Sequence, residues 1–302
     1  MNLLNSQERK GYLQIFLAGA LWSTIGPFIM TMSRYGSTLV FTSFLRMAIA
    51  SVILFAVTVA KFGLSALRIS KKELFLCALL GLICQGIYNV FYSLAVTLTG
   101  VAISAVLLNL APVFTAIMAG VIFSEKITWL KTLALFVNVF GCVLAATGGS
   151  LDARCNSWIG ILYGVGAGFC YSLTAIIGRF AGEKSNVFVV STYSYIFASL
   201  FLAVFMHPWK MSVCFNGKLL AVGLLFALIP TAIAYLFYYS GVQKITETSK
   251  VPVIASVETI LAAMLGIVFY NERMGLANLA GIFLVIGSII LTSCRTEKNQ
   301  KI

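Results

Sequence analysis

One carboxylate, Glu258, lies in the middle of a long apolar stretch, residues 248–270. At about 1.5 Å per residue along a helix, it lies about 15 Å from the start of that stretch. If the stretch spans a membrane, an ionisable group at this depth costs at least a few kcal/mol and marks a functional site by default. Proton coupling and the binding of an amine on a substrate are the two functional interpretations.

Arg46 offers a structural alternative, because it lies inside another apolar stretch, residues 38–60. Counted from the start of its stretch, Arg46 is at a depth similar to that of Glu258. The two charges could therefore form a buried ion pair, which would be a structural arrangement and not a site. The sequence leaves three roles open for this pair of charges: a structural pair, proton coupling and substrate contact.

A polar and aromatic stripe follows one face of the stretch 73–97. Gln85, Tyr88, Asn89 and Tyr92 have the spacing i, i+3, i+4, i+7, which places them on the same side of a helix. Two tyrosines on that face favour the wall of a substrate cavity, with ring stacking and amide hydrogen bonds. Hydrogen bonding between helices is the alternative, since such side chains also join membrane helices.

Five more residues are candidate substrate contacts. Tyr235 and Tyr239 repeat the aromatic pattern just after Pro230. Trp22 lies mid-stretch, away from the interfacial level that tryptophan usually prefers, and Tyr171 is its counterpart in the second half of the chain. Asn109 is a weaker candidate.

Glu125 and Glu272 end two apolar stretches, and each is followed by a basic residue. Pairing with that neighbour, or with a loop from the other half of the chain, is the structural interpretation. A gate at each end of a transport pathway is the functional one.

The composition requires a lipid environment for these stretches. The chain has 302 residues, of which 60% are hydrophobic and 10% charged, and its mean hydropathy is +1.00. Soluble domains have about 25% charged residues. The net charge of +12 does not predict a nucleic-acid partner, because the basic residues lie in short breaks between apolar stretches. We expect no metal site, no cofactor and no enzyme activity.

Ten stretches are long and apolar enough to cross a bilayer as helices. They cover residues 12–32, 38–60, 73–97, 100–123, 127–147, 158–180, 186–206, 217–240, 248–270 and 274–293. With the N-terminus in the cytoplasm, fifteen of the 21 Lys and Arg residues lie on the inside, five lie outside, and Arg46 is left within a span. This bias predicts a multi-pass protein of the cell membrane with both termini cytoplasmic.

The chain also repeats itself. Tyr92-Ser93 and Glu125 match Tyr239-Ser240 and Glu272 at the same offset of 147, which is 239 − 92 and 272 − 125. Five helices in each half make the second half enter the membrane from the opposite side. The predicted organisation is a cytoplasmic N-terminus (1–11), a first five-helix repeat (12–147), a linker (148–157), a second, inverted repeat (158–293) and a cytoplasmic tail (294–302).

Several motifs carry a resemblance to a known family. They are Phe123-Ser124-Glu125 and Tyr270-Asn271-Glu272, Gly141, Gly281 and Gly287 in the closing helices, Phe44-Leu45-Arg46-Met47-Ala48, and Gly19-Ala20-Leu21-Trp22-Ser23 with Gly168-Phe169-Cys170-Tyr171-Ser172. With its ten short-looped spans, the chain resembles the EamA family of the drug/metabolite transporter superfamily. One departure is Ser194, which stands where Arg46 would repeat.

The resemblance implies a secondary transporter of small metabolites, such as amino acids or nucleobases, that works by alternating access and exports its substrate. Protons are a candidate coupling ion, and a homodimer is a candidate assembly. A membrane sensor or regulatory subunit on a transporter scaffold is the alternative function. The short stretch after Cys294 counts against that alternative.

Overall fold

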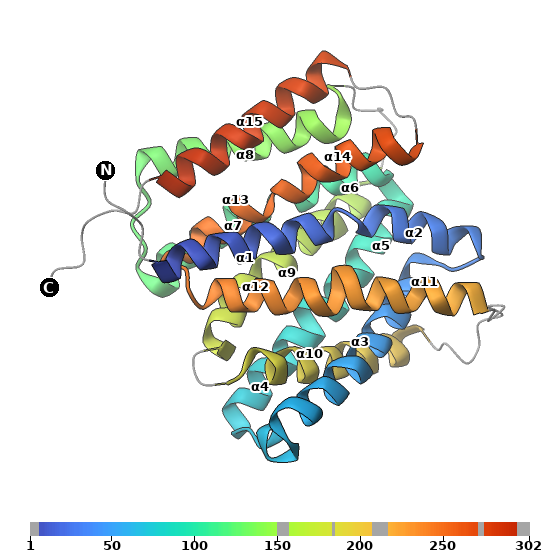
Figure 1. Cartoon of the computed structure of the whole chain (residues 1–302). Coiled ribbons are helices and arrows are strands. Elements are labelled where there is room, and N and C mark those ends of the chain that lie inside the picture. Colours follow the sequence, from blue (N-terminus) through green and yellow to red (C-terminus); the bar gives the residue numbers. More distant parts are fainter. Residues whose placement is uncertain (1–5, 150–156, 183–184, 207–216, 271–274, 295–302) are drawn as a thin grey trace, which may run out of the picture.

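In the computed structural model, the described residues are 6–149, 157–182, 185–206, 217–270 and 275–294, and every regular element among them is a helix (Figure 1). Nine helical segments of this part of the chain are long and apolar enough to cross a membrane. The tenth predicted stretch also forms a helix, whose apolar part, Leu276–Thr292, is shorter. The nine are Ser6–Arg34, Leu39–Phe62, Lys71–Thr99, Ile103–Phe123, Trp129–Thr147, Trp158–Gly182, Val187–Phe205, Gly217–Val242 and Thr248–Gly266.

Several of these spans are broken into shorter elements. In chain order the elements are α1 (Ser6–Trp22), α2 (Ile25–Arg34), α3 (Leu39–Phe62), η1 (Leu64–Leu67), α4 (Lys71–Leu79), η2 (Leu80–Ile87), α5 (Tyr88–Thr99), α6 (Val101–Leu108), α7 (Ala111–Phe123), α8 (Trp129–Thr147), α9 (Trp158–Gly182), α10 (Val187–Met206), α11 (Gly217–Ala227), η4 (Leu228–Ile233), α12 (Ala234–Val242), η5 (Thr248–Lys250), α13 (Val251–Ala255), α14 (Val257–Tyr270) and α15 (Leu276–Cys294).

Side-chain caps and glycines set several helix ends. Thr38 and Thr128 accept hydrogen bonds from backbone amides in the first turns of α3 and α8, as N-cap residues do. Ser70 and Glu73 form a reciprocal capping box at the start of α4. Gly63 ends α3 with a φ of 77°, a conformation that only glycine adopts without strain.

Two spans contain a π-helical segment at matching positions. The η2 segment lies between α4 and α5, and η4 lies between α11 and α12. Adding the repeat offset of 147 to 80–87 gives 227–234, which contains η4 (228–233). Pro230, which has no N–H to donate, explains the second π segment. Such segments occur frequently at functional sites.

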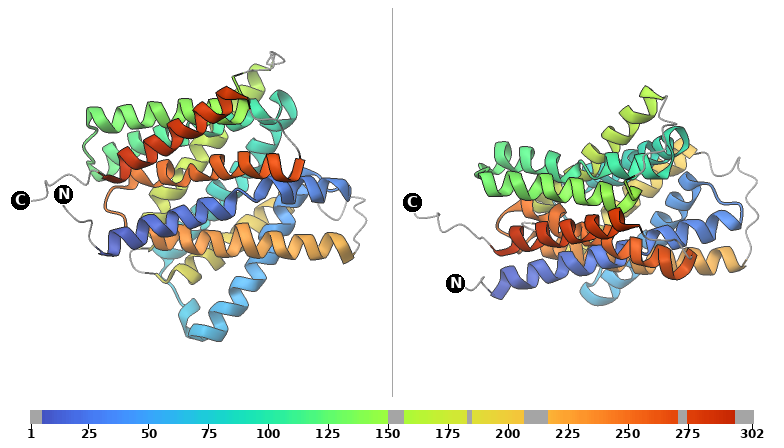
Figure 2. Two further views of the ribbon diagram at one scale, coloured as in Figure 1. Left: turned by 45° about the horizontal axis from the view of Figure 1, so that its top comes forward. Right: turned by 90° about the horizontal axis from the view of Figure 1, so that it is seen from above.

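The spans from the two halves of the chain pack in pairs. α8 lies against α15 and α3 against α10, while α1 packs on α12 and α5 on α9 (Figures 1 and 2). The α8–α15 contact is close because Gly141 and Gly281 face each other's backbone, as small residues allow in membrane helices. α1 begins and α15 ends at the same end of the bundle.

Large apolar side chains cover much of the outer surface of the helices. Phe136, Leu162 and Phe283 are each 71% exposed. An aqueous protein rarely leaves so many apolar side chains in contact with water. The exposed face is therefore the surface that meets lipid, and the chain is a multi-pass membrane protein.

Candidate functional site

Aromatic side chains from four spans meet at the centre of the bundle. Trp22, at the end of α1, has its ring centroid 6.0 Å from that of Tyr171 and 5.0 Å from those of Tyr235 and Tyr238. Tyr88 of α5 lies 5.7 Å from Tyr171 of α9. These distances are typical of packed aromatic pairs. We call this group the aromatic cluster; its members are Trp22, Tyr88, Tyr92, Tyr171, Tyr235, Tyr238 and Tyr239.

The predicted stripe, which begins in η2 with Gln85 and continues on α5, therefore joins the predicted tyrosines of α12 and α9. Tyr88 stacks on Tyr92 at 6.1 Å, and Tyr235 lies 5.8 Å from Tyr239. Tyr88, Tyr92 and Tyr171 keep partial exposure, whereas Tyr235 and Tyr239 are buried. The cluster thus has a closed side on α12 and a partly exposed side on α5 and α9.

Arg46 is held beside this cluster by the polar side of the stripe. Its Nη2 donates a hydrogen bond of 3.1 Å to Asn89 Oδ1, to which Ser43 also donates at 2.9 Å. Asn89 in turn donates to the carbonyl of Gln85 at 2.6 Å. The guanidinium lies over the ring of Phe226, 5.2 Å from its centroid, which stabilises a desolvated cation.

Glu258 lies in the first turn of α14, immediately after the helix break at Ser256. It interacts electrostatically with Arg46 and with Tyr92, so it belongs to the same central region. No ion pair within 4.0 Å joins it to Arg46 among the described residues. The structure therefore does not contain the direct ion pair between Arg46 and Glu258 that was the structural interpretation. Glu258 is partly exposed.

Several buried polar atoms of this region have no hydrogen-bond partner in the described part of the chain. They are Nη1 of Arg46, Nε1 of Trp22 and the hydroxyl of Tyr239. Arg46 is 5% exposed, Trp22 2% and Tyr239 1%. A buried polar group without a partner costs about 1–3 kcal/mol, so these are groups that a polar ligand would stabilise by hydrogen bonding.

Asn109 plays a local part. It follows α6 as its C-cap residue, and its side-chain amide donates a 2.9 Å hydrogen bond to the carbonyl of Ala105. It therefore occupies the break between α6 and α7. The offset of 147 relates Asn109 to Ser256, so both halves interrupt the same span at the same position.

Glu125 lies at the end of the bundle where α1 begins. Its carboxylate accepts hydrogen bonds from the backbone amide of Thr248 (2.5 Å), and from the backbone amide (3.2 Å) and hydroxyl (2.5 Å) of Ser249. Arg179 lies 3.7 Å from the same carboxylate. Ser124, with a left-handed φ of 53°, turns the chain at the end of α7. Glu125 thus pairs across to the second half of the chain; Glu272 lies outside the described residues.

Sequence reasoning missed two residues around Arg46. Ser43 precedes Arg46 by three positions on α3 and donates to the same oxygen of Asn89; this spacing puts both residues on one helix face and could have indicated the shared partner. Phe226 comes from α11, and nothing in its local sequence indicates a cation partner.

The family model of the EamA-like transporter family matches residues 9–147 and 158–294. An uncharacterized transporter of Clostridium kluyveri is 25% identical over 306 residues, covering 97% of this chain and 96% of the relative. A probable terminal-alkyne amino-acid exporter of Streptantibioticus cattleyicolor is 23% identical over 296 residues, covering 97% and 96%. A solved structure titled only as a protein crystal structure superposes with a TM-score of 0.80 at 18% identity, over 94% of this chain and 97% of that one.

Proposed function

Because the chain belongs to the EamA-like transporter family, we propose that it is a secondary transporter that exports amino acids with an apolar or aromatic side chain. The observation that carries this substrate class is the pair of opposite charges, Arg46 and Glu258, that lie near the same aromatic cluster without pairing. An amino acid carries a carboxylate, an ammonium group and a side chain, and each finds a partner of suitable chemistry here.

The carboxylate of the substrate is assigned to the Arg46 side. Among the described residues, Nη1 of Arg46 and Nε1 of Trp22 are donors without a partner, and charged hydrogen bonds to a carboxylate are about twice as strong as neutral ones. The ammonium group is assigned to Glu258. The side chain would pack on Tyr88, Tyr92 and Tyr171, which are the partly exposed members of the aromatic cluster.

The name of one relative supports this class, since the Streptantibioticus cattleyicolor protein is named a probable amino-acid exporter. A nucleobase would stack on the same rings and bind the amide of Gln85, but it has no ammonium group for Glu258. Nucleobases are therefore the second class to test.

We also infer that ten helices form two inverted five-helix repeats that exchange access between the two sides. Three features support this organisation. The helices pair reciprocally, α1 with α12 and α9 with α5. The π segments η2 and η4 occupy matching positions, and so do the breaks at Asn109 and Ser256. Inverted halves of this kind form a midplane site that opens to either side as they rock.

The orientation proposed from the basic residues puts both termini in the cytoplasm. The Glu125 end is then the cytoplasmic end, and its hydrogen bonds to Thr248 and Ser249 join the two halves there. Glu125 would act as the gate on this side, and Glu272 as its counterpart outside.

The test is uptake by the purified protein in liposomes, with and without an imposed pH gradient. The panel contains labelled aromatic, aliphatic and charged amino acids, nucleobases and a cationic dye. We expect saturable accumulation of aromatic or large aliphatic amino acids that competes within that class. Saturable accumulation of nucleobases alone would contradict the assigned substrate class.

Proton coupling is tested on Glu258→Gln, which keeps the size of the side chain and removes its charge. We expect this variant to lose accumulation driven by the pH gradient and to keep exchange down a substrate gradient. Glu73→Gln is the matched control, because Glu73 caps α4 outside the central region and should keep both activities. Accumulation by Glu258→Gln equal to that of the unmodified protein would exclude Glu258 as the coupling residue.

A further inference from the structure

Asn138 of α8 joins three helical segments at one buried point. Its side-chain Nδ2 donates hydrogen bonds to Ser256 Oγ at 2.7 Å and to Ser288 Oγ at 2.9 Å. Asn138 is 1% exposed, Ser256 8% and Ser288 0%. Ser288 lies on α15, whereas Ser256 follows α13 as its C-cap residue and immediately precedes α14. One amide therefore connects the helix break at Ser256 to both α8 and α15.

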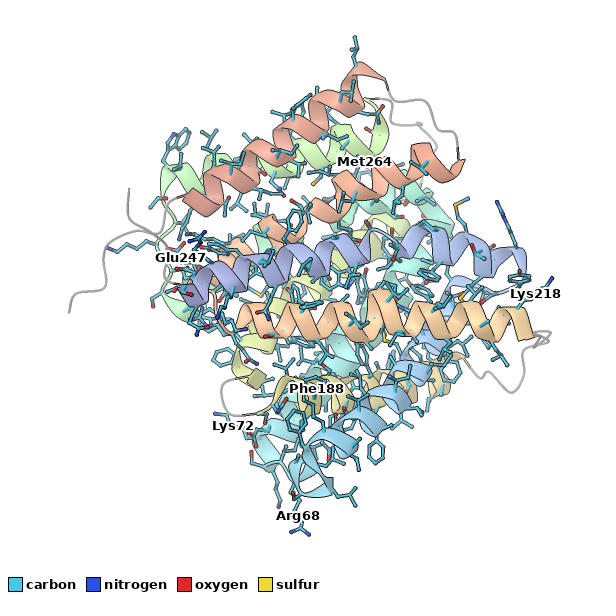
Figure 3. All side chains as sticks on the ribbon, viewed as in Figure 1. Arg68, Lys72, Phe188, Lys218, Glu247 and Met264 are labelled. Carbon is cyan, nitrogen blue, oxygen red and sulfur yellow. The ribbon has the colours of Figure 1, made fainter. Side chains whose placement is uncertain are left out.

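The face of α8 that carries Asn138 lies beside Glu258. Cys142, which follows Asn138 by one helical turn, interacts electrostatically with Glu258. α14 runs beside α8 and α15, and Figure 3 labels Met264 further along this helix. Ser256 precedes Glu258 by two positions. The contact from Asn138 therefore holds the backbone from which Glu258 projects.

The two halves of the chain differ at this point. The positions at an offset of 147 from Asn138, Ser288 and Glu258 hold residues without a polar side chain, Val285, Gly141 and Ala111. At the matching break in the first half, the amide of Asn109 donates within its own span, to the carbonyl of Ala105. The link through Asn138 and the mid-span carboxylate thus occur at the same break, and neither side chain has a counterpart in the other half.

The amide of Asn138 has a fixed orientation. Each serine donates its own hydrogen to a backbone carbonyl three residues earlier, at 2.5 Å for Ser256 and at 2.8 Å for Ser288. Both serine oxygens are therefore acceptors toward Asn138, and they turn its N–H groups toward them. The amide oxygen is left buried, with no hydrogen-bond partner among the described residues. Such an unpaired group is rare and calls for an explanation, which we find in what the two N–H groups hold.

The break at Ser256 affects the electrostatics of Glu258. α14 begins at Val257, so Glu258 lies in the first turn of a helix of 14 residues. The free amides and the dipole at a helix N-terminus stabilise a negatively charged side chain. A helix that ran on through Ser256 would remove this N-terminus from the middle of the span. The ionised form of Glu258, which is the form that binds an ammonium group, therefore depends on the break.

We propose that Asn138 is a positioning residue for Glu258, because its hydrogen bond to Ser256 holds the break that places Glu258 in the first turn of α14. The consequence for transport rests on the function proposed above, in which Glu258 acts. Ser288 offers a matched control. It accepts a hydrogen bond from the same amide and is also buried, but it lies within α15 and not at the break.

The experiment is labelling of Glu258 in the full chain by dicyclohexylcarbodiimide, which reacts with protonated carboxyl groups, followed by mass spectrometry over a range of pH. Ser256→Ala should move the pH of half-maximal labelling upward by about half a unit, as the loss of a helix N-terminus does. Ser288→Ala should leave it unchanged. Asn138→Val, which introduces the residue of the matching position, should move it as Ser256→Ala does, and the double variant should move it no further.

The variants leave the other groups around Glu258 in place. The titratable and charged side chains that face Glu258 come from α3, α5, α8, α9 and α12, and they are Arg46, Tyr88, Tyr92, Cys142, Tyr171 and Tyr235. Since none of them is substituted, a shift of the labelling midpoint reports on the break.

Three results would overturn the proposal. The first is an unchanged midpoint in Ser256→Ala. The second is an equal shift in Ser256→Ala and Ser288→Ala, which would mean that the amide of Asn138 only joins helices. The third is an additive shift in the double variant, which would mean that Asn138 acts on Glu258 by another route. Thermal unfolding shows that each variant is folded. Labelling requires no transport, so this proposal and the proposed function can fail separately.

Discussion

Glu125→Gln tests how strongly the two halves of the chain are held together at the end where α1 begins. The side chain keeps its size and loses its charge. Glu125 is 8% exposed and accepts three hydrogen bonds, two from backbone amides and one from a hydroxyl. Because the carboxylate satisfies donors at the start of the span Thr248–Gly266, losing its charge should loosen that start.

The magnitude follows from the number of bonds. Thr248 donates to one carboxylate oxygen and Ser249 donates twice to the other, whereas glutamine has a single acceptor oxygen. If that oxygen stays with Ser249, loss of the Thr248 bond costs about 1.5–3 kcal/mol, and the two remaining bonds lose up to about 1 kcal/mol each because their acceptor is neutral, which is about 3 kcal/mol in all. The Arg179 contact adds little, because it is 3.7 Å long and the Arg179 side chain is 28% exposed. A loss of about 3 kcal/mol changes an opening equilibrium about a hundredfold.

Hydrogen exchange of the backbone amides of Thr248 and Ser249 measures this opening directly. We expect exchange at both amides to accelerate by up to about a hundredfold in Glu125→Gln. In the control Glu73→Gln, the change falls on the capping box at Ser70, at the start of α4, so the amides of Thr248 and Ser249 should be unaffected. Unchanged exchange at these amides in Glu125→Gln, or the same acceleration in both variants, would refute the assigned role of Glu125.

Two other substitutions test the packing and the central site. Gly281→Ala would bring a methyl group to 2.6 Å from the carbonyl of Gly141, so we expect its unfolding free energy to fall by about 1–3 kcal/mol. Gly287→Ala is the control, because a methyl group at that position meets no atom within 4 Å, and it should unfold in detergent like the parent. Asn89→Leu removes the hydrogen-bond acceptor of Arg46 and should lower the unfolding free energy by about 1.5–3 kcal/mol. Asn89→Asp should restore that stability, but its carboxylate should engage Arg46 and weaken substrate binding. Substrate affinity equal to that of the parent in a binding assay would contradict this role of Arg46.

The helical segments were predictable because the bilayer fixes both their length and their composition. Each predicted stretch has a counterpart helix. The i, i+3, i+4, i+7 spacing put Tyr88 and Tyr92 on one helix face, and in the structure their rings stack at 6.1 Å. Periodicity along one helix shows which side chains share a face, and the shared polar face then identified the side that turns inward.

The helix irregularities were only partly predictable. Pro230 lies inside η4 and accounts for that segment, and Pro252 lies in the first turn of α13, where proline favours the start of a helix. The η2 segment, in contrast, has no proline, and the break at Asn109 precedes Pro112. These features depend on packing against other helices, which a single helix sequence does not contain.

The partners of the charged residues were the least predictable. Depth along a span suggested that Arg46 and Glu258 lie at one level, but depth does not fix lateral position. Arg46 instead bonds Asn89 and lies over Phe226. Likewise Glu125, which is adjacent to Lys126 in sequence, pairs with residues more than a hundred positions away.

The separation of Arg46, Glu258 and the aromatic cluster has a stereochemical consequence. The three groups differ in chemistry and come from different helices, α3, α14 and chiefly α5, α9 and α12. In the proposed site, each contacts one of three different substituents on the α-carbon of an amino acid. The mirror-image substrate can satisfy two of these contacts, but its third substituent then points away from its partner. A carrier built in this way distinguishes L- from D-amino acids even though none of its individual contacts is selective for handedness.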